Sequence, residues 1–170
     1  EQDDDDAVQG LLGTLGCEVV AAIPDLEAEA TGHADMLVQF VRRDHAMVVE
    51  LDAADDPDAS HLLDVGAQFL LLAASAAGHP LTVTRVPATY LDDGTLYSYV
   101  NGTRLAGRYL APSYEKVDAK VASRALKALR EAMPGEDIVS IPSDEVIESS
   151  GAVHCMTLGL TLPSRPSDRV

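Results

Sequence analysis

Apolar and polar residues alternate along the chain in patterns that predict strands and helices in a regular order. Two short apolar segments, 36–42 and 45–51, are separated by two polar residues, a pattern typical of a β-hairpin. Acidic residues at 55–58 predict the start of a helix, and apolar positions then recur at helical spacing as far as Gly78. The segment 81–86 is again strand-like, so the predicted order is ββαβ.

The same order is predicted a second time further along the chain. Segments 96–100 and 104–110 flank an Asn-Gly pair at 101–102, which is the strongest short signal for a hairpin turn. A helix is predicted over 117–132 and another strand over 137–141. Two units with the same order of elements indicate a chain built from repeated modules.

The predicted fold class is therefore α/β, with one partial domain over 1–170 whose two ββαβ units lie at about 35–86 and 96–141. Segment 7–23 is typical of the helix and last strand of a preceding unit, and 151–158 of the first strand of a following one. An array that is cut inside a unit leaves apolar faces and strand edges uncovered. We therefore expect a missing N-terminal half, a partner chain or self-association to cover them.

Charge narrows the range of partners. Twelve basic residues against 28 acidic ones give a formal net charge of −16. Nucleic acids and anionic membranes gain affinity from Lys and Arg contacts to phosphate, so neither is an expected partner. No apolar run approaches the ~20 residues that a membrane-spanning helix needs. The acidic surface suits a cationic ligand, although solubility alone also explains such a charge.

Two short segments carry candidate chemistry. His33 and Asp35 are two residues apart, so in an extended segment their side chains face the same side. Cys155 follows a turn of small residues in a segment that we predict to be a strand. Cysteine hydrolases need a thiolate, an acid–base group and recognition of charge. The residues alone leave two interpretations open. They could form a catalytic set, or His33 and Asp35 could be ordinary surface residues and Cys155 a core residue.

The other Cys and His residues carry weaker signals. Cys17 and Cys155 form neither a disulfide framework nor a metal-ligand spacing, and Cys17 opens an apolar run, which is typical of a core residue. His45, His61 and His79 lie at a turn, near a helix start and beside a proline, so we expect each to be solvated.

Several segments together resemble a known family. The segment 32–35, Gly-His-Ala-Asp, followed by Phe40-Val41 resembles the GHxD…F signature of agmatine deiminases and bacterial, Porphyromonas-type peptidylarginine deiminases. The resemblance continues in the family's N-G…P-x-Y…P-G…HCxT order, which is found at 99–102, 111–114, 133–139 and 151–157. It covers roughly residues 17–163.

The resemblance implies a fold, a reaction and roles for three residues. The fold is a propeller of five ββαβ modules (a pentein), of which this chain would form about the C-terminal half. Cys155 would attack the central carbon of a guanidinium, His33 would protonate the departing ammonia and then activate water, and Asp35 would bind the guanidinium N–H groups. His154 would point to the opposite face of the strand and be structural. Neither a metal nor another cofactor is implied.

Substrate, location and activity stay open at this level. The resemblance implies a small cationic substrate such as agmatine or free or peptidyl arginine, and for agmatine a place in putrescine biosynthesis. The cytoplasm is the expected location, with secretion as the alternative. No segment matches the family's second guanidinium-binding carboxylate, and the glycines before Cys155 are reduced in number. A diverged, non-catalytic interaction module and an amidinotransferase are therefore the alternative functions.

Overall fold

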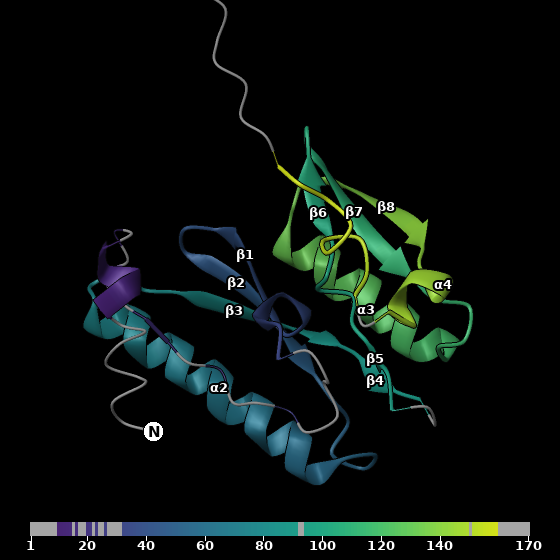
Figure 1. The fold of residues 1–170 in the computed structure, drawn as a ribbon, viewed down its shortest axis with the longest axis horizontal. Helices are drawn as coiled ribbons and strands as arrows, with labels where there is room; N and C mark the ends of the chain where they lie inside the picture. The colour runs from purple at the N-terminus through teal and green to yellow at the C-terminus, as the bar shows by residue number, and fades with distance from the viewer. Residues whose placement is uncertain are drawn as a thin grey trace, which may run out of the picture.

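Two three-stranded sheets and two long helices make up most of the described structure (Figure 1). The computed structural model describes residues 10–14, 16, 20, 21, 23, 26, 32–91, 94–149 and 151–159. Each sheet is built by a stretch of chain with the order strand, strand, helix, strand. The mixed α/β class is thus confirmed, whereas the grouping into one partial propeller domain stays a prediction.

The first sheet contains the hairpin that the hydrophobic pattern predicts. Strands β1 (Val38–Arg42) and β2 (His45–Glu50) are antiparallel and are joined by Arg43 and Asp44. Helix α2 (Pro57–Ala76) follows, and β3 (Thr82–Pro87) then pairs with β2 in parallel. The central position of β2 explains why its first five residues are all buried.

Local chemistry sets the ends of α2. The carboxylate of Asp56 accepts a hydrogen bond from the backbone N–H of Ala59 at 2.9 Å, which caps the first turn. Pro57 occupies the first helical position, where its missing N–H costs no hydrogen bond. Gly78 has a φ of 73°, a left-handed conformation that ends helices and that glycine adopts without strain.

The second sheet has its turn at a different place from the one that the sequence predicts. Strands β6 (Thr103–Leu105) and β7 (Arg108–Ser113) are joined by Ala106 and Gly107, whose φ values are 51° and 79°. Two consecutive positive φ angles are what a tight hairpin turn requires. The prediction of a turn at 101–102 is therefore wrong, because Asn101 is fully buried and makes long-range hydrogen bonds.

The rest of the second unit follows the predicted order. Helix α3 (Ala119–Ala132) leads to β8 (Asp137–Pro142), which pairs in parallel with β7. Of the predicted strand 96–100, only β5 (Leu96–Tyr97) is a strand, and it pairs with the short β4 (Thr89–Tyr90). Residues 99 and 100 of that segment form a bend instead.

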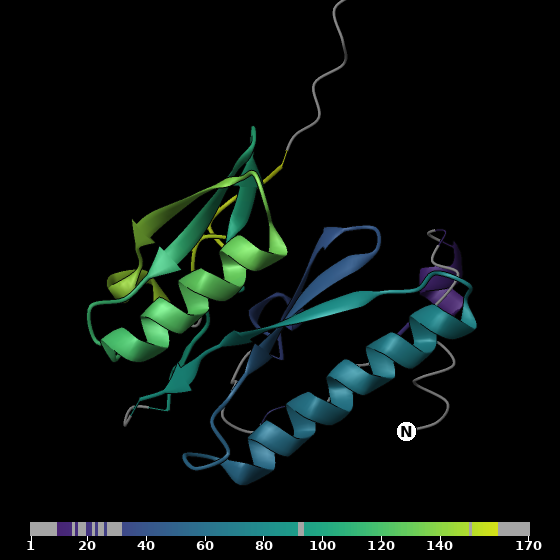
Figure 2. The same ribbon diagram turned by 180° about the vertical axis from the view of Figure 1, so that it is seen from behind.

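Helix α3 packs against both sheets and so joins the two units. It contacts β3 and β2 of the first unit as well as β8 of its own (Figure 2). Its buried positions are Ala125, Ala128, Leu129 and Ala132. Three alanines on one face allow a helix to approach a sheet closely, and this face belongs to the continuous apolar core.

Helix α2, by contrast, exposes an apolar stripe. Ala59, Leu63, Gly66 and Ala67 are its buried residues. Leu62, Phe69 and Leu72 lie along another side at helical spacing, and they are 37%, 58% and 66% exposed. We call these three residues the outer stripe of α2. Several exposed large apolar side chains along one side of a helix are typical of a docking face.

Length and composition alone would allow α2 to cross a membrane, which the sequence expectation did not foresee. An 18-residue stretch of this 20-residue helix has a mean hydropathy of 1.3, and 17% of that stretch is buried. The helix nevertheless lies against β2 and β3, and Asp64 in its middle pairs with Arg85 at 2.7 Å. A charged residue in the centre of a bilayer is costly, so the absence of a membrane partner stays our prediction.

The segments outside the two units differ in how far they can be described. Residues 10–14 are helical, within the helix predicted over 7–15. Cys17 and most of the strand predicted over 17–23 lie outside the described residues. The strand predicted over 151–158 is wrong as far as that segment is described, because residues 153–156 form a turn. This turn follows the short helix α4 (Asp144–Ile147).

Candidate active site

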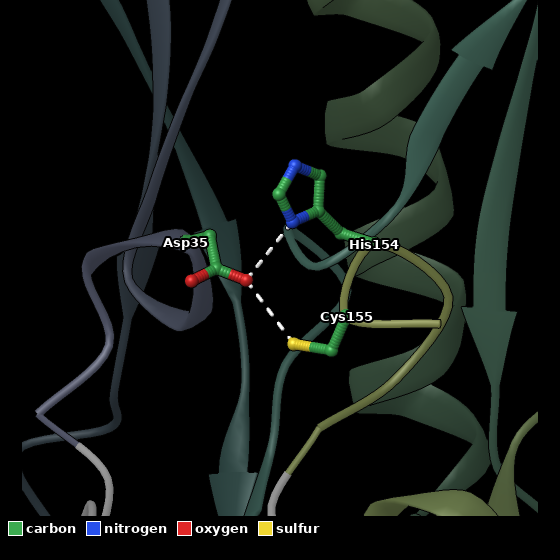
Figure 3. A group of neighbouring side chains, drawn as sticks. All are labelled: Asp35, His154 and Cys155. Carbon is green, nitrogen blue, oxygen red and sulfur yellow. Dashed lines mark hydrogen bonds and ion pairs between the residues drawn. The ribbon is translucent and has the colours of Figure 1, made fainter. Parts of the chain in front are cut away.

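Three side chains from segments that are far apart in the sequence meet at one place. Asp35 belongs to a single 3-10 turn, η1 (Ala34–Met36), which leads into β1. His154 and Cys155 belong to the turn at 153–156. Figure 3 shows the three side chains pointing toward one another across the gap between these two segments. The predicted meeting of Asp35 with Cys155 is therefore present.

One carboxylate oxygen is the centre of the group. Asp35 Oδ2 accepts a hydrogen bond from the thiol of Cys155 at 3.2 Å and contacts His154 Nδ1 at 3.0 Å. It also accepts a hydrogen bond from the side-chain amide of Asn101 at 2.7 Å. Three polar groups converging on one oxygen fix the orientation of the carboxylate, because each restricts the same torsion angle.

Asn101 holds the Cys155 segment in place, a role that the sequence analysis missed. Its Oδ1 accepts a hydrogen bond from the backbone N–H of Ala152 at 2.9 Å, and its carbonyl oxygen accepts one from the N–H of His154 at 3.0 Å. Its Nδ2 lies 3.2 Å from Cys155 Sγ. Its position in the N-G part of the family signature could have indicated this role, but the Asn-Gly pair is also typical of a hairpin turn and was predicted to be one.

A buried tyrosine supports the segment that carries Asn101. The hydroxyl of Tyr109 accepts a hydrogen bond from the N–H of Gly102 at 3.1 Å and donates one to the carbonyl of Val100 at 2.8 Å. A Cβ on Gly102 would lie 2.5 Å from the Tyr109 ring, so only glycine allows this close approach. Burial raises the pKa of Tyr109, which keeps its hydroxyl protonated.

Further hydrogen bonds connect this segment to the part of the chain that carries Asp35. The hydroxyl of Ser98 donates to the carbonyl of Met36 at 2.7 Å, and the side-chain amide of Gln39 donates to the carbonyl of Gly102 at 2.8 Å. Because these bonds link η1 and β1 to segment 98–102, the separation of Asp35 and Cys155 is set by fixed backbone on both sides.

Gly151 allows Cys155 to turn back toward the site. A Cβ on Gly151 would lie 2.8 Å from Cys155 Cβ and 3.0 Å from its Sγ. Real Cβ atoms do not approach so closely, so any larger residue would push the cysteine away from its observed place. The small residue before the nucleophile segment therefore has a steric role.

The thiol and the carboxylate share a proton that stays on sulfur. Burial acts to raise the pKa of Asp35, but hydrogen bonds from Cys155 and His154 outweigh it and hold the pKa below its usual value. For the Cys155 thiol, partial burial and then the hydrogen bond to Asp35 raise the pKa, while the hydrogen bond from Asn101 acts to lower it. The arrangement without a ligand is thus a neutral thiol beside an ionised carboxylate.

The predictions for the two nearby histidines have different outcomes. We expected His154 to face away from the site. This is wrong, because its Nδ1 contacts Asp35 Oδ2. The error follows from the wrong strand prediction, because alternate residues face opposite sides in a strand but not in a turn. His33 is exposed and directly precedes η1, two residues from Asp35. Its pairing with Cys155 stays a prediction.

The expectation that His45 is solvated is also wrong. His45 is 5% exposed rather than solvated. Its Nδ1 contacts Arg42 at 2.9 Å and its Nε2 contacts the hydroxyl of Thr84 at 2.8 Å. Burial, and then the positive charge of Arg42, lower its pKa, so it is a neutral structural residue in the first sheet. His61 and His79 are exposed, as predicted.

A separate hollow lies away from this group and does not compete with it as the reaction site. It measures about 320 Å³ and is lined by residues around the end of β2 and the first half of α2. Two of its carboxylates are already paired, Glu50 with Arg124 at 3.1 Å and Asp64 with Arg85 at 2.7 Å. No cysteine or histidine is among its lining residues.

Comparison with known proteins gives a consistent result. Residues 2–160 match the model of the family described as Porphyromonas-type peptidyl-arginine deiminase. An agmatine deiminase from Stutzerimonas stutzeri is 28% identical over 76% of this chain and 40% of its own length. One from Pseudomonas fluorescens is 26% identical over 86% of this chain and 45% of its own length. The chain therefore spans less than half of the length of these curated relatives.

Solved structures show the same fold. The agmatine deiminase of C. jejuni superposes with a TM-score of 0.66 at 17% identity, covering 89% of this chain and 45% of that one. The agmatine deiminase of Enterococcus faecalis gives a TM-score of 0.60 at 19% identity, covering 72% of this chain and 38% of that one. At these identities the likeness concerns the fold.

Proposed function

Because the chain belongs to the Porphyromonas-type peptidyl-arginine deiminase family, we propose that it carries the cysteine side of a site that hydrolyses a guanidinium group. The products are a ureido compound and ammonia, and the substrate class is a linear amidine such as agmatine or arginine. One observation carries the proposal: Asp35 and Cys155, 120 residues apart in the sequence, are in hydrogen-bond contact. A carboxylate beside a thiol provides both a cation-binding group and a nucleophile.

The reaction uses Cys155 as the nucleophile. Its thiolate forms a bond to the central guanidinium carbon, which gives a tetrahedral adduct. His33 donates a proton to one nitrogen, and the C–N bond breaks to release ammonia and leave a thiouronium intermediate. His33 then takes a proton from water as the water adds to the same carbon. Cleavage of the C–S bond releases the ureido product and restores the thiolate.

A cationic substrate solves the problem of the raised thiol pKa. In the structure the thiol proton lies between Cys155 and Asp35. A guanidinium that donates its own N–H groups to Asp35 takes over this acceptor and places a positive charge beside the sulfur. Positive charge favours the thiolate, and the thiol proton is released to solvent. The substrate therefore helps to activate its own nucleophile, and a neutral ligand would not.

We further propose that an N-terminal half completes the pocket. In the relatives this chain covers 40–45% of the length, and no segment of its sequence matches the family's second guanidinium-binding carboxylate. Helix α3 packs on β3 of the unit before its own. By the same repeat, the outer stripe of α2 would pack on the unit before the first one. Extension of this packing in both directions leads to the five-module propeller.

The proposal is tested by assaying ureido product and ammonia with the complete protein. Agmatine and arginine are the first substrates, and the neutral ureido analogue of agmatine is the control ligand. Cys155→Ala is expected to abolish turnover while leaving the far-UV circular dichroism spectrum unchanged. Turnover at the wild-type rate in Cys155→Ala would sink the proposal. Amidinated product after addition of an acceptor amine would instead indicate amidino transfer.

The acid–base assignment has a matched test in the two neighbouring histidines. His33→Gln is expected to lower kcat by about 10²–10⁴-fold, the range that a positioned acid–base group contributes. His154→Gln removes a contact to Asp35 but no transferred proton, so a smaller loss is expected. The reverse order, with the larger loss in His154→Gln, would reject His33 as the acid–base residue and favour His154.

A further inference from the structure

The side chains of Asp35, His154 and Cys155 present three different donor atoms to one point. Their ligand atoms, a carboxylate oxygen, Nδ1 and Sγ, all lie within 4.8 Å of one another. Asp35 Oδ2 is 3.0 Å from His154 Nδ1 and 3.2 Å from Cys155 Sγ. A set of sulfur, imidazole nitrogen and carboxylate oxygen is what Zn²⁺ and related thiophilic ions prefer.

We propose that these three side chains form a binding site for one thiophilic divalent cation of the Zn²⁺ type, and that the bound ion blocks the guanidinium site. The family resemblance implied no metal. The turn at 153–156 brings His154 and Cys155 to the same carboxylate. The metal site rests on this geometry alone, whereas its inhibitory effect rests on the proposed function.

The two distances to Asp35 Oδ2 fit a tetrahedral ion after small movements, and the third pair of ligand atoms lies within 4.8 Å. With metal–ligand bonds of about 2.0–2.3 Å, neighbouring ligand atoms lie roughly 3.3–3.7 Å apart. The two measured contacts of Asp35 Oδ2, 3.0 and 3.2 Å, need to open by only a few tenths of an ångström. Both His154 and Cys155 are exposed, so their side chains can make these adjustments without disturbing the core.

The backbone beneath the site is anchored, which favours a site that is formed before the ion arrives. The N–H of His154 donates to the carbonyl of Asn101 at 3.0 Å, and the N–H of Thr157 donates to the carbonyl of His154 at 3.0 Å. Asn101 Nδ2 holds Asp35 Oδ2 at 2.7 Å. A hydrogen bond of this kind to a ligating carboxylate orients the ligand and tunes the affinity for the metal.

The charges also balance. Binding replaces the thiol proton, which is released to the buffer, so the ion meets one thiolate, one carboxylate and one neutral imidazole. A dication cancels the two negative charges, which would otherwise repel each other at about 3 Å. The exposed sides of His154 and Cys155 leave a fourth position for water, as in zinc sites with three protein ligands.

The functional consequence follows from the shared atoms. The guanidinium would need Asp35 Oδ2 and the sulfur lone pair of Cys155, and the metal ion would use both. The ion and the substrate therefore exclude each other. Inhibition should be competitive with respect to a guanidinium substrate and reversed by a chelator.

The test is a titration of the complete protein with Co²⁺, a spectroscopic substitute for Zn²⁺. We expect one equivalent to bind with a thiolate-to-cobalt charge-transfer band, and excess Zn²⁺ to remove the band. Cys155→Ser should abolish it. His154→Ala should weaken binding by about tenfold or more, since losing even an outer partner costs 10–100-fold. His61→Ala, which changes an exposed histidine on α2, is the matched control and should bind like the wild type.

Several outcomes would overturn the proposal. These are the absence of a charge-transfer band, a band that persists in Cys155→Ser, and equal weakening by His61→Ala and His154→Ala. Circular dichroism of each variant checks that it is folded, and slower alkylation of Cys155 in the presence of Zn²⁺ gives a second measure of binding. Metal binding without deiminase turnover would reject the proposed function but keep the site. Turnover that is unaffected by Zn²⁺, with no cobalt band, would reject the site alone.

Discussion

The thiol of Cys155 donates a hydrogen bond to Asp35 Oδ2 at 3.2 Å, although 120 residues separate the two in the chain. Each residue shifts the other's acidity in the direction that keeps the proton on sulfur. The pair is thus held in a form that is not yet nucleophilic, and a cation is the ligand that would change it. Competition for one carboxylate oxygen connects the proposed reaction with the proposed metal site.

The first prediction concerns the acidity of Cys155. Asp35→Asn replaces the charged carboxylate, which raises the pKa of the thiol, by a neutral amide, so this pKa should fall toward the usual range. Partial burial still acts to raise it. The measurement is the rate of alkylation by iodoacetamide as a function of pH, whose midpoint reports the thiol pKa. In wild type this midpoint should lie above that of an ordinary thiol.

A second variant should move the same midpoint the other way. Asn101→Ala removes the donor whose hydrogen bond lowers the pKa of Cys155, so alkylation should require a higher pH than in wild type. Because Asn101 is buried, circular dichroism and thermal unfolding must show that this variant is folded. A shift of the same sign in both variants would refute the assignment of opposite effects to the two partners.

Gly151 should be required for the position of the nucleophile. Gly151→Ala places a methyl group 2.8 Å from Cys155 Cβ and 3.0 Å from its Sγ. The turn must move, and we expect a loss of about 10²-fold in kcat, because a displacement of about 1 Å can have this effect. Gly159→Ala is the matched control, since a Cβ there meets nothing within 4 Å. Equal activities of the two variants would contradict the steric argument.

The hydrophobic pattern identified the elements whose formation depends on local sequence. Helices α2, with 20 residues, and α3, with 14, have apolar residues at helical spacing and capping aspartates, so their residues alone determine most of their length. The β1–β2 hairpin follows from two apolar runs and a polar pair. The sequence identified Asp35 and Cys155 as candidates, the resemblance implied their roles, and the structure brings these two into contact.

Long-range contacts decided what the sequence could not show. Asn101 and Gly102 are the best local turn signal in the second unit, yet Asn101 donates hydrogen bonds to Asp35 and Cys155 and accepts one from the N–H of Ala152, and these outweigh the local preference. The segment 153–156 has the apolar character of a strand, but it forms a turn held by Asn101. A local hydrophobic pattern cannot reveal a hydrogen-bond partner about 50 residues away. The turn that points His154 at Asp35 was therefore not predicted, and the role of His154 was missed.

Two buried tyrosines give a third prediction, on stability. Tyr109→Phe removes the hydroxyl that bonds to the N–H of Gly102 and to the carbonyl of Val100, two groups that also bond to each other at 2.8 Å. We expect the free energy of unfolding to fall by about 0.5–1.5 kcal/mol, the net contribution of a hydrogen bond whose partners stay satisfied. The Tyr99 hydroxyl is buried without a hydrogen-bond partner in the described part of the chain. Tyr99→Phe should therefore leave the free energy of unfolding unchanged or raise it. Urea unfolding of both variants measures the two changes.

The last prediction concerns the outer stripe of α2. If an N-terminal unit covers it in the complete protein, Leu72→Lys places a charge in an apolar interface. The complete protein should then lose more than the roughly 1.5–3 kcal/mol that burial of a leucine side chain contributes. Ser123→Lys is the control, because this exposed serine lies on helix α3, away from the stripe. Equal stability of the two variants in urea unfolding, together with unchanged turnover, would show that nothing packs on the stripe.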